Sequence, residues 1–385
     1  MSNMLGFLEV FSVWQWWNYL CSQIPVGKTA LRINLDETAI CLFQGDGKGN
    51  VFMSKTCPSA PVQDVPRRRR RCFLTHVALV CDRTDIQPLL PQVLIANEAT
   101  FPAGLMPALR AACPANVFLV RQKSSWNNSD LCSQIMRWLG LALLPFRGTL
   151  QPVLLLDAVR IHTTPQVLRA CVACQIWPLV VPAKTTWLMQ PLDTHAFLAF
   201  KAHLRNSYQQ ARVAADVADL DIARFLQCVY DSIRAVLQGQ RWLPAFADNG
   251  FSDGQNGIRG SIKRQLRVDV TVAVVLPMGR PTLEQLQSCF PRRSTIPTAL
   301  LWRPFDGPSV AVAHASSSAA ARRGSVEAQP LLMQGRTRAA HKMAQSSHAA
   351  AAIGAADEAV AVSPIVAIGR RLPRKRAVAV AEELS

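Results

Sequence analysis

Three apolar runs in this sequence each lead to an aspartate, and this arrangement constrains the fold more than any other feature. The runs and their acids are Leu31–Leu35 with Asp36, Pro152–Leu156 with Asp157, and Ile176–Val181 with Asp193. Continuous runs of Val, Ile and Leu are typical of buried strands in sheets with parallel pairing. Ligands of open α/β sheets gather at the carboxyl ends of such strands. Two strand-end acids and a third on the following helix are therefore expected to converge at one point.

The chemistry of three convergent carboxylates indicates a metal site. Carboxylate oxygens suit Mg²⁺ or Mn²⁺. Two such ions about 3.5–4 Å apart clamp the attacking and leaving oxygens of a phosphodiester. Asp36, Asp157 and Asp193 are thus the candidate catalytic residues and the candidate metal ligands.

The residues around these acids resemble the DDE superfamily of transposase endonucleases, in its pogo and mariner branch with the domesticated centromere-protein relatives. The motifs that carry the resemblance are Leu35-Asp-Glu-Thr38, Leu156-Asp157 with His162 five residues on, and Pro182, Thr185-Thr186 and Gln190-Pro-Leu-Asp193. The 35 residues between the last two aspartates match the spacing of that branch. The resemblance spans roughly residues 30–210 and implies a ribonuclease-H-like fold, metal-dependent cleavage of DNA and a site at these three aspartates.

Two positions depart from the family pattern. Family members have Asn directly after the second aspartate, where this chain has Ala158, and the third acid is Asp193 rather than Glu. Side chains that support metal ligands commonly change affinity or activity about 10–100-fold. Nothing before Asp36 has the pattern of a helix-turn-helix, so the chain is expected to be a catalytic core without the usual DNA-binding module.

The charge of the chain, like the family resemblance, favours DNA as a partner. The 385 residues carry 42 Lys and Arg against 25 Asp and Glu, a net charge of +17. Lys and Arg displace counterions from phosphates, so such an excess suits a polyanion. A basic protein with no specific partner is the alternative. Charge and motif together favour DNA, bound mainly by electrostatics and with little sequence preference.

Cysteine usage and hydropathy favour an intracellular protein without a membrane span. The 11 cysteines lack the dense spacing of a disulfide framework. Cys171 and Cys174 form a lone CxxC motif, and buried thiols explain it more simply than a metal site. No uninterrupted apolar run reaches about 18 residues. The Trp-rich start of the chain lacks a basic n-region, which argues against a signal peptide and favours an amphipathic helix.

The chain divides into four segments by composition and pattern. We expect an N-terminal amphipathic helix over 1–25, the α/β catalytic core with its mixed sheet flanked by helices over 26–215, a mostly helical extension over 216–306, and a disordered Ala/Ser-rich basic tail over 307–385. Within the core, strands are expected on both sides of Asp36-Glu37-Thr38, followed by a Gly-rich turn at Gly45–Gly49. A helix over Ser125–Leu144 is expected to bury Trp126.

Several side chains allow more than one interpretation. Glu37 should face away from Asp36 if the strand continues, so we do not count it as a ligand. His162 either orients the site or is structural. Lys201 and Arg205 are expected to be solvated, with phosphate contact as the alternative. The arginines at Arg67–Arg71 and the basic stretch Gly369–Arg376 are solvated charge, DNA-binding patches or nuclear-import signals.

Two functions remain open at this point. The first is a transposase-derived endonuclease that uses Mg²⁺ or Mn²⁺ for DNA cleavage and strand transfer, working in the nucleus or otherwise in the cytoplasm, with a homodimer as one form of assembly. The second is a domesticated or inactive relative that binds nucleic acid without cutting it. Ala158 favours the second function, and the three intact aspartates favour the first.

Overall fold

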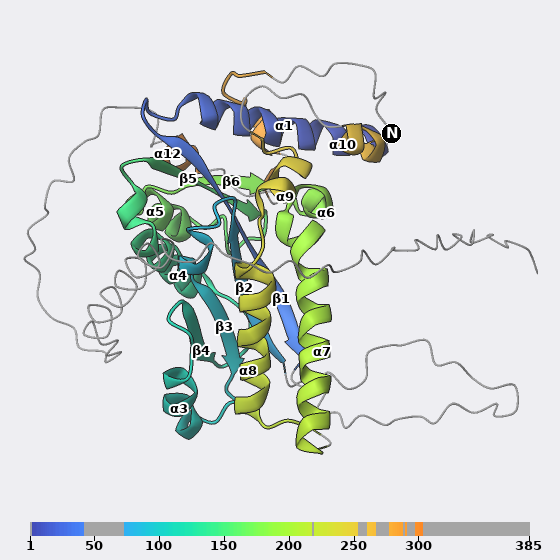
Figure 1. The fold of residues 1–385 in the computed structure, drawn as a ribbon. Coiled ribbons are helices and arrows are strands. Elements are labelled where there is room, and N and C mark those ends of the chain that lie inside the picture. Colours follow the sequence, from blue (N-terminus) through green and yellow to red (C-terminus); the bar gives the residue numbers. More distant parts are fainter. Residues whose placement is uncertain are drawn as a thin grey trace, which may run out of the picture. The chain divides into compact units, whose positions relative to one another are not determined.

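Six strands form one mixed sheet in the order β4-β3-β2-β1-β5-β6 (Figure 1). Their bounds are β1 Thr29–Cys41, β2 Phe73–Cys81, β3 Gln92–Asn97, β4 Val117–Gln122, β5 Leu150–Asp157 and β6 Trp177–Val181. The first three strands are antiparallel, β5 and β6 run parallel to β1, and β4 runs parallel to β3. This computed structural model describes residues 2–41, 73–217, 219–252, 260–266, 277–287, 289–290 and 297–302.

Helices cover both faces of the sheet. The α-helices are α1 Ser2–Ser22, α3 Met106–Ala111, α4 Ser129–Ala142, α5 Pro165–Ala173, α6 Thr186–Met189, α7 Phe197–Ala215, α8 Ile222–Ser232, α9 Leu243–Asp248, α10 Gly260–Leu266, α11 Leu283–Gln287 and α12 Thr298–Trp302. Short 3₁₀ turns are η2 Gln87–Leu89, η3 Ala103–Leu105, η4 Leu144–Phe146 and η5 Ala183–Thr185, and π-helical turns are η6 Leu192–Ala196 and η7 Ile233–Gln238.

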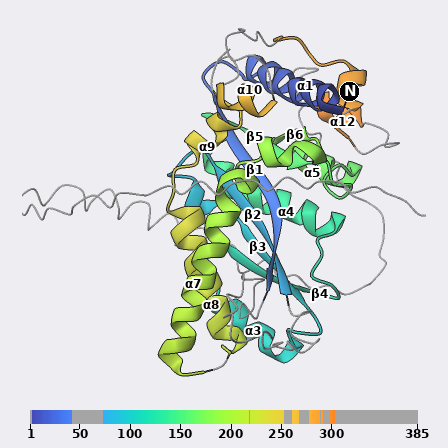
Figure 2. The same ribbon diagram turned by 90° about the vertical axis from the view of Figure 1, so that its right-hand side faces the viewer.

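Alternation along the strands separates two hydrophobic layers. Leu154 and Leu156 of β5 belong to the hydrophobic cluster that includes α4 and α5, whereas Val153 and Leu155 belong to the cluster that includes α1, α7 and α8. Figure 2 shows α4 and α5 on one side of the sheet and α7 and α8 on the other. Successive side chains of a strand point to opposite faces, so this pairing follows directly from the sequence. The mixed sheet flanked by helices confirms the predicted ribonuclease-H-like fold class.

Local capping explains where the helices beside the site begin. The side chain of Asn128 accepts a hydrogen bond from the backbone N–H of Leu131 at 2.9 Å and so caps α4. Thr164 does the same for α5, with Pro165 in the first helical position. Asn and Thr satisfy the free N–H groups of a first turn, and Pro tolerates that position because it has no N–H.

Three sequence predictions need correction. β1 is one strand of 13 residues, so Asp36 lies in its middle instead of at a strand end. Trp126 precedes α4 and is 69% exposed, whereas the periodicity predicted it to be buried. Every residue of α1 from Val10 to Leu20 is buried or half-buried, including the polar Ser12, Gln15 and Asn18, in place of the expected amphipathic helix.

Other predictions agree with the structure or lie beyond it. Phe197, Phe200 and Leu204 of α7 are buried, and Cys171 and Cys174 are free thiols, as the sequence predicts for the two cysteines. The Gly-rich turn, both basic stretches and the 307–385 tail lie outside the described residues. Among the described helices, none is long and apolar enough to cross a membrane. The described residues belong to a single unit, Met1–Ser316. The four segment boundaries stay predictions.

Candidate active site

The sheet register brings Asp36 and Asp157 together. Asn34 of β1 pairs with Leu155 of the parallel strand β5. Two residues further along each strand, Asp36 lies beside Asp157, and both side chains project from the face that packs against α7. Neighbouring strands are about 4.8 Å apart, so the two carboxylates are close. β5 ends at Asp157, so the site lies at the carboxyl end of that strand, as predicted, although Asp36 is a mid-strand residue.

Asp193 reaches the site from a π-helical turn. The turn η6 follows Pro191 and continues into α7, so Asp193 lies in the first turn of that helical run as expected. Single π-helical turns inside helices are frequent at functional sites. Asp193 is exposed, whereas Asp36 and Asp157 are half-buried, so the site opens to solvent on the Asp193 side.

The electrostatics of Asp36 show that the three carboxylates interact. Burial, the charge of Asp193 and the charge of Asp157 raise the pKa of Asp36 to about 8, against the opposing effects of the Glu37 N–H and of His162. Like charges disfavour ionisation of a neighbouring carboxylate. The structure therefore brings the three predicted residues into one electrostatic group, while their catalytic and metal-binding roles stay predictions.

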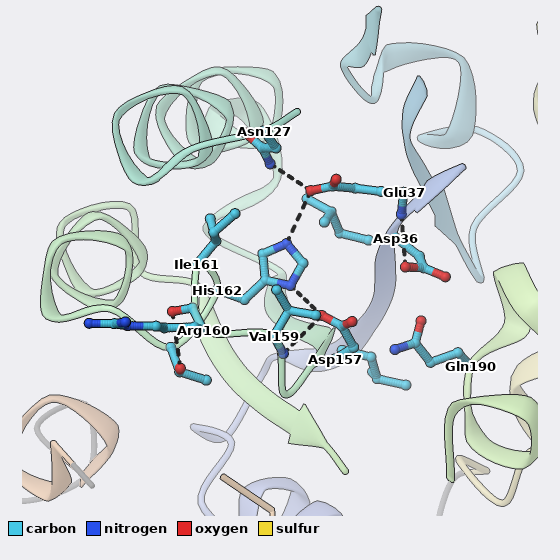
Figure 3. A network of polar contacts seen from close by, with 12 residues as sticks. Asp36, Glu37, Asn127, Asp157, Val159, Arg160, Ile161, His162 and Gln190 are labelled. Carbon is cyan, nitrogen blue, oxygen red and sulfur yellow. Dashed lines mark hydrogen bonds and ion pairs between the residues drawn. The ribbon is translucent and has the colours of Figure 1, made fainter. Parts of the chain in front are cut away.

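His162 joins Asp157 to Glu37 (Figure 3). The imidazole is only 2% exposed, with Nδ1 2.5 Å from Asp157 Oδ1 and Nε2 3.6 Å from Glu37 Oε1. The second contact is too long for a hydrogen bond and is a charge contact. Burial alone would lower the pKa of His162, but its contacts with both carboxylates outweigh burial and raise the pKa to about 10. The ring is therefore cationic at neutral pH.

Glu37 lies on the opposite face of β1 from Asp36, as the alternation predicts. Its Oε1 accepts a hydrogen bond from Asn127 Nδ2 at 2.8 Å, from the loop before α4. The chain Asn127–Glu37–His162–Asp157 therefore fixes one oxygen of Asp157 from outside the carboxylate group (Figure 3). The sequence left the role of His162 open, and nothing in its pattern pointed to Asn127.

The donor chemistry fits a divalent cation. Burial raises the pKa of Asp36 most, and the negative charges of Asp193 and Asp157 raise it further. A dication that prefers oxygen ligands would offset these charges. Within the described ranges, no three His, Cys, Asp or Glu side chains already stand in a metal-binding arrangement. The fit therefore rests on the type of donor and on charge.

One family model matches part of this chain. Residues 122–239 match the DDE superfamily endonucleases. The match contains Asp157, His162 and Asp193, so the DDE resemblance of the sequence is confirmed over these residues. Asp36 lies upstream of the match, and its place in the site comes from the sheet register.

Solved structures with some similarity are Mos1 transposase complexes. The Mos1 paired-end complex with the left transposon end is 14% identical, with a TM-score of 0.31 and coverage of 63% of this chain and 62% of that chain. The Mos1 mariner paired-end complex with Mn is 14% identical, with a TM-score of 0.32 and coverage of 63% of this chain and 62% of that chain. A pre-cleavage Mos1 transpososome is 13% identical, with a TM-score of 0.30 and coverage of 64% of both chains. This chain thus spans less than two thirds of those chains. No curated protein matches it significantly.

Proposed function

We propose that this chain is the core of a DDE-type endonuclease that cleaves phosphodiester bonds of DNA. The observation that carries the proposal is the electrostatic group of Asp36, Asp157 and Asp193 on the mixed sheet. Asp157 and Asp193 lie within the residues that match the DDE endonucleases. Asp36, Asp157 and Asp193 would hold two Mg²⁺ or Mn²⁺ ions. When bound, these ions activate the attacking water or 3′-hydroxyl and stabilise the leaving oxygen.

Other side chains of the protein would orient the carboxylates and bind the DNA backbone. His162 holds Asp157 Oδ1 and leaves Oδ2 without a bond to the imidazole. Lys201 and Arg205 are exposed on α7, the helix that follows Asp193, and are suited to bind the phosphate backbone. Lys184 is exposed in the turn η5 before the Gln190-Pro-Leu-Asp193 motif. A net charge of +17 supplies the general attraction to DNA.

A second candidate function is a domesticated relative that binds nucleic acid without cutting. Ala158 favours it, because this residue stands where the family has Asn and is only 8% exposed. An Asn at this place could hydrogen-bond a ligand of the site, so Ala158→Asn should leave activity unchanged or raise it. Nuclear localisation and homodimer formation stay predictions under either function.

Plasmid nicking over a series of Mg²⁺ and Mn²⁺ concentrations tests the proposal. Wild-type protein should nick DNA, and Asp157→Ala and Asp193→Ala should abolish nicking while DNA affinity persists, because affinity comes from Lys and Arg. Asp85→Ala is the control, since Asp85 is 53% exposed and pairs with the equally exposed Arg83. Nicking by both aspartate variants would reject the site. No nicking by wild-type protein with either metal would favour the domesticated function.

A further inference from the structure

Asn34 is a fully buried amide in β1, two residues before Asp36. A buried amide without partners costs free energy, so its hydrogen bonds show what it holds together. Its Nδ2 donates to the carbonyl of Leu155 at 3.3 Å, and its Oδ1 accepts from the backbone N–H of Leu192 at 2.9 Å. A third contact, from Nδ2 to the carbonyl of Leu35, stays within β1.

These partners sit next to the other two aspartates. Leu155 lies two residues before Asp157 on β5, and Leu192 directly precedes Asp193 in η6. One side chain on β1 therefore bonds the backbones of both other elements that carry a site aspartate. Removing it would release the η6 turn from the sheet without touching any carboxylate.

Gln190 is the second fully buried amide of this group. In the orientation that satisfies both of its polar atoms, Nε2 donates to Asp36 Oδ2 at 3.3 Å and Oε1 accepts from the backbone N–H of Asp157 at 3.3 Å. In the opposite orientation, drawn in Figure 3, Oε1 would accept from Asn34 Nδ2 at 3.4 Å but would face an oxygen of Asp36. The first orientation avoids this repulsion, so it is the one we adopt.

We propose that Asn34 and Gln190, which we term the amide pair, are positioning residues that set the spacing of the three aspartates. Asn34 ties the backbones of β1, β5 and η6 together, and Gln190 spans from the Asp36 carboxylate to the Asp157 backbone. Neither side chain needs to touch an ion. The inference rests on the proposed function, since it concerns the geometry in which the aspartates would hold metal.

Mn²⁺ affinity of the full chain, measured by electron paramagnetic resonance, tests the role of the amide pair. Asn34→Leu and Gln190→Met keep the approximate side-chain volume and remove the amide. Supporting side chains of metal ligands change affinity about 10–100-fold, so each variant should bind Mn²⁺ that much more weakly. Because the aspartates remain, nicking by these variants should recover when the Mn²⁺ concentration is raised.

Gln87→Met is the matched control. Gln87 is also fully buried, and its amide accepts from the Cys81 N–H at 2.6 Å and donates to the Leu79 carbonyl at 3.1 Å, beside β2. Loss of the Gln87 amide should reduce thermal stability, as loss of the Asn34 or Gln190 amide does, while Mn²⁺ affinity stays at the wild-type value. A general effect of removing a buried amide is thereby separated from an effect on the site.

The outcomes distinguish the inference from the function on which it rests. If the wild-type protein binds Mn²⁺ and both Gln190→Met and Asn34→Leu bind it with the same affinity, the positioning role of the amide pair is overturned. The proposed function would still stand. If Asn34→Leu fails to fold, the affinity of Gln190→Met decides alone. Folded wild-type protein that binds no Mn²⁺ would overturn the metal site and the inference together. An equal loss of affinity in Gln87→Met would also reject the positioning role.

Discussion

At the scale of single residues, Asp157 has a buried partner that fixes one of its carboxylate oxygens. Its Oδ1 contacts a buried imidazole that is itself braced by Glu37 and Asn127. A carboxylate fixed at one oxygen can offer the other in a defined direction, which reduces the cost of ordering a ligand. The contact between Asp157 and His162 is thus supported by Glu37, which lies on the opposite face of β1 from Asp36.

The first residue-scale prediction concerns His162. His162→Ala should lower Mn²⁺ affinity about 10–100-fold, because Asp157 loses the partner that orients it. DNA affinity, measured by fluorescence anisotropy, should not change. His203→Ala serves as control, since His203 bonds Ser232 at 3.0 Å outside the site. Wild-type Mn²⁺ affinity in His162→Ala would show that the imidazole is only a packing residue.

At the scale of elements, α1 belongs to the support of the site. Trp14 donates its indole N–H to the Asn249 carbonyl at 3.1 Å, and the Asn249 side chain accepts from Thr194 Oγ1 at 3.0 Å, next to Asp193. Trp17 bonds the Ser252 carbonyl at 3.2 Å and stacks against the Arg32 guanidinium at 5.2 Å from the ring centre. The N-terminal helix therefore reaches the η6 turn through one asparagine.

Gly250→Ala tests this link between elements. Gly250 has φ of +91°, and an added Cβ would lie 2.3 Å from the Trp14 indole nitrogen. Backbone strain and the clash together should lower the free energy of unfolding by about 2–4 kcal/mol. The measurement is urea denaturation followed by tryptophan fluorescence. Gly104→Ala is the control, because nothing lies within 4 Å of its added Cβ. Equal stability of the two variants would contradict the packing described here.

A buried histidine in β2, His76, should make the free energy of unfolding fall at acid pH. Burial lowers the pKa of His76 to about 4 from its ordinary 6.5, although a 2.9 Å hydrogen bond with Gln92 opposes this shift. The unfolded chain binds the proton more readily, so His76 stabilises the fold above pH 6.5 and loses this contribution as pH falls from 6.5 towards 4. The loss should reach about 3 kcal/mol. His76→Gln should make the free energy of unfolding depend less on pH between 4 and 6.5, as measured by urea denaturation at several pH values. An unchanged pH dependence in this variant would show that groups other than His76 cause it.

At the scale of the whole molecule, the sequence predicted the sheet better than the site. Apolar runs located β5 and β6 to within a few residues, because buried strands leave a clear pattern. The polar Asp36-Glu37-Thr38 segment looked like a break, yet β1 continues through it because β2 pairs with it over Ile33–Cys41. Tertiary pairing of this kind leaves no local signal.

The same limit applies to the site and to the tryptophans. The three aspartates could be predicted from their settings, but Asn34 could not, since its partners Leu155 and Leu192 are far away in sequence. Trp126 fitted the helical spacing of α4, but the Asn128 cap starts that helix after it. The N-terminal segment was expected to be an amphipathic helix, but its polar residues Ser12, Gln15 and Asn18 are buried in α1.

Anomalous diffraction from crystals soaked in Mn²⁺ tests the central claim most directly. The account predicts one or two manganese peaks bridged by carboxylate oxygens of Asp36, Asp157 and Asp193, with metal–oxygen distances of about 2.1 Å. Two peaks should be about 4 Å apart. Crystals of Asp157→Ala, soaked identically, should lose the peaks. Manganese bound elsewhere, or carboxyl groups more than about 10 Å apart in the soaked crystal, would contradict a shared metal site.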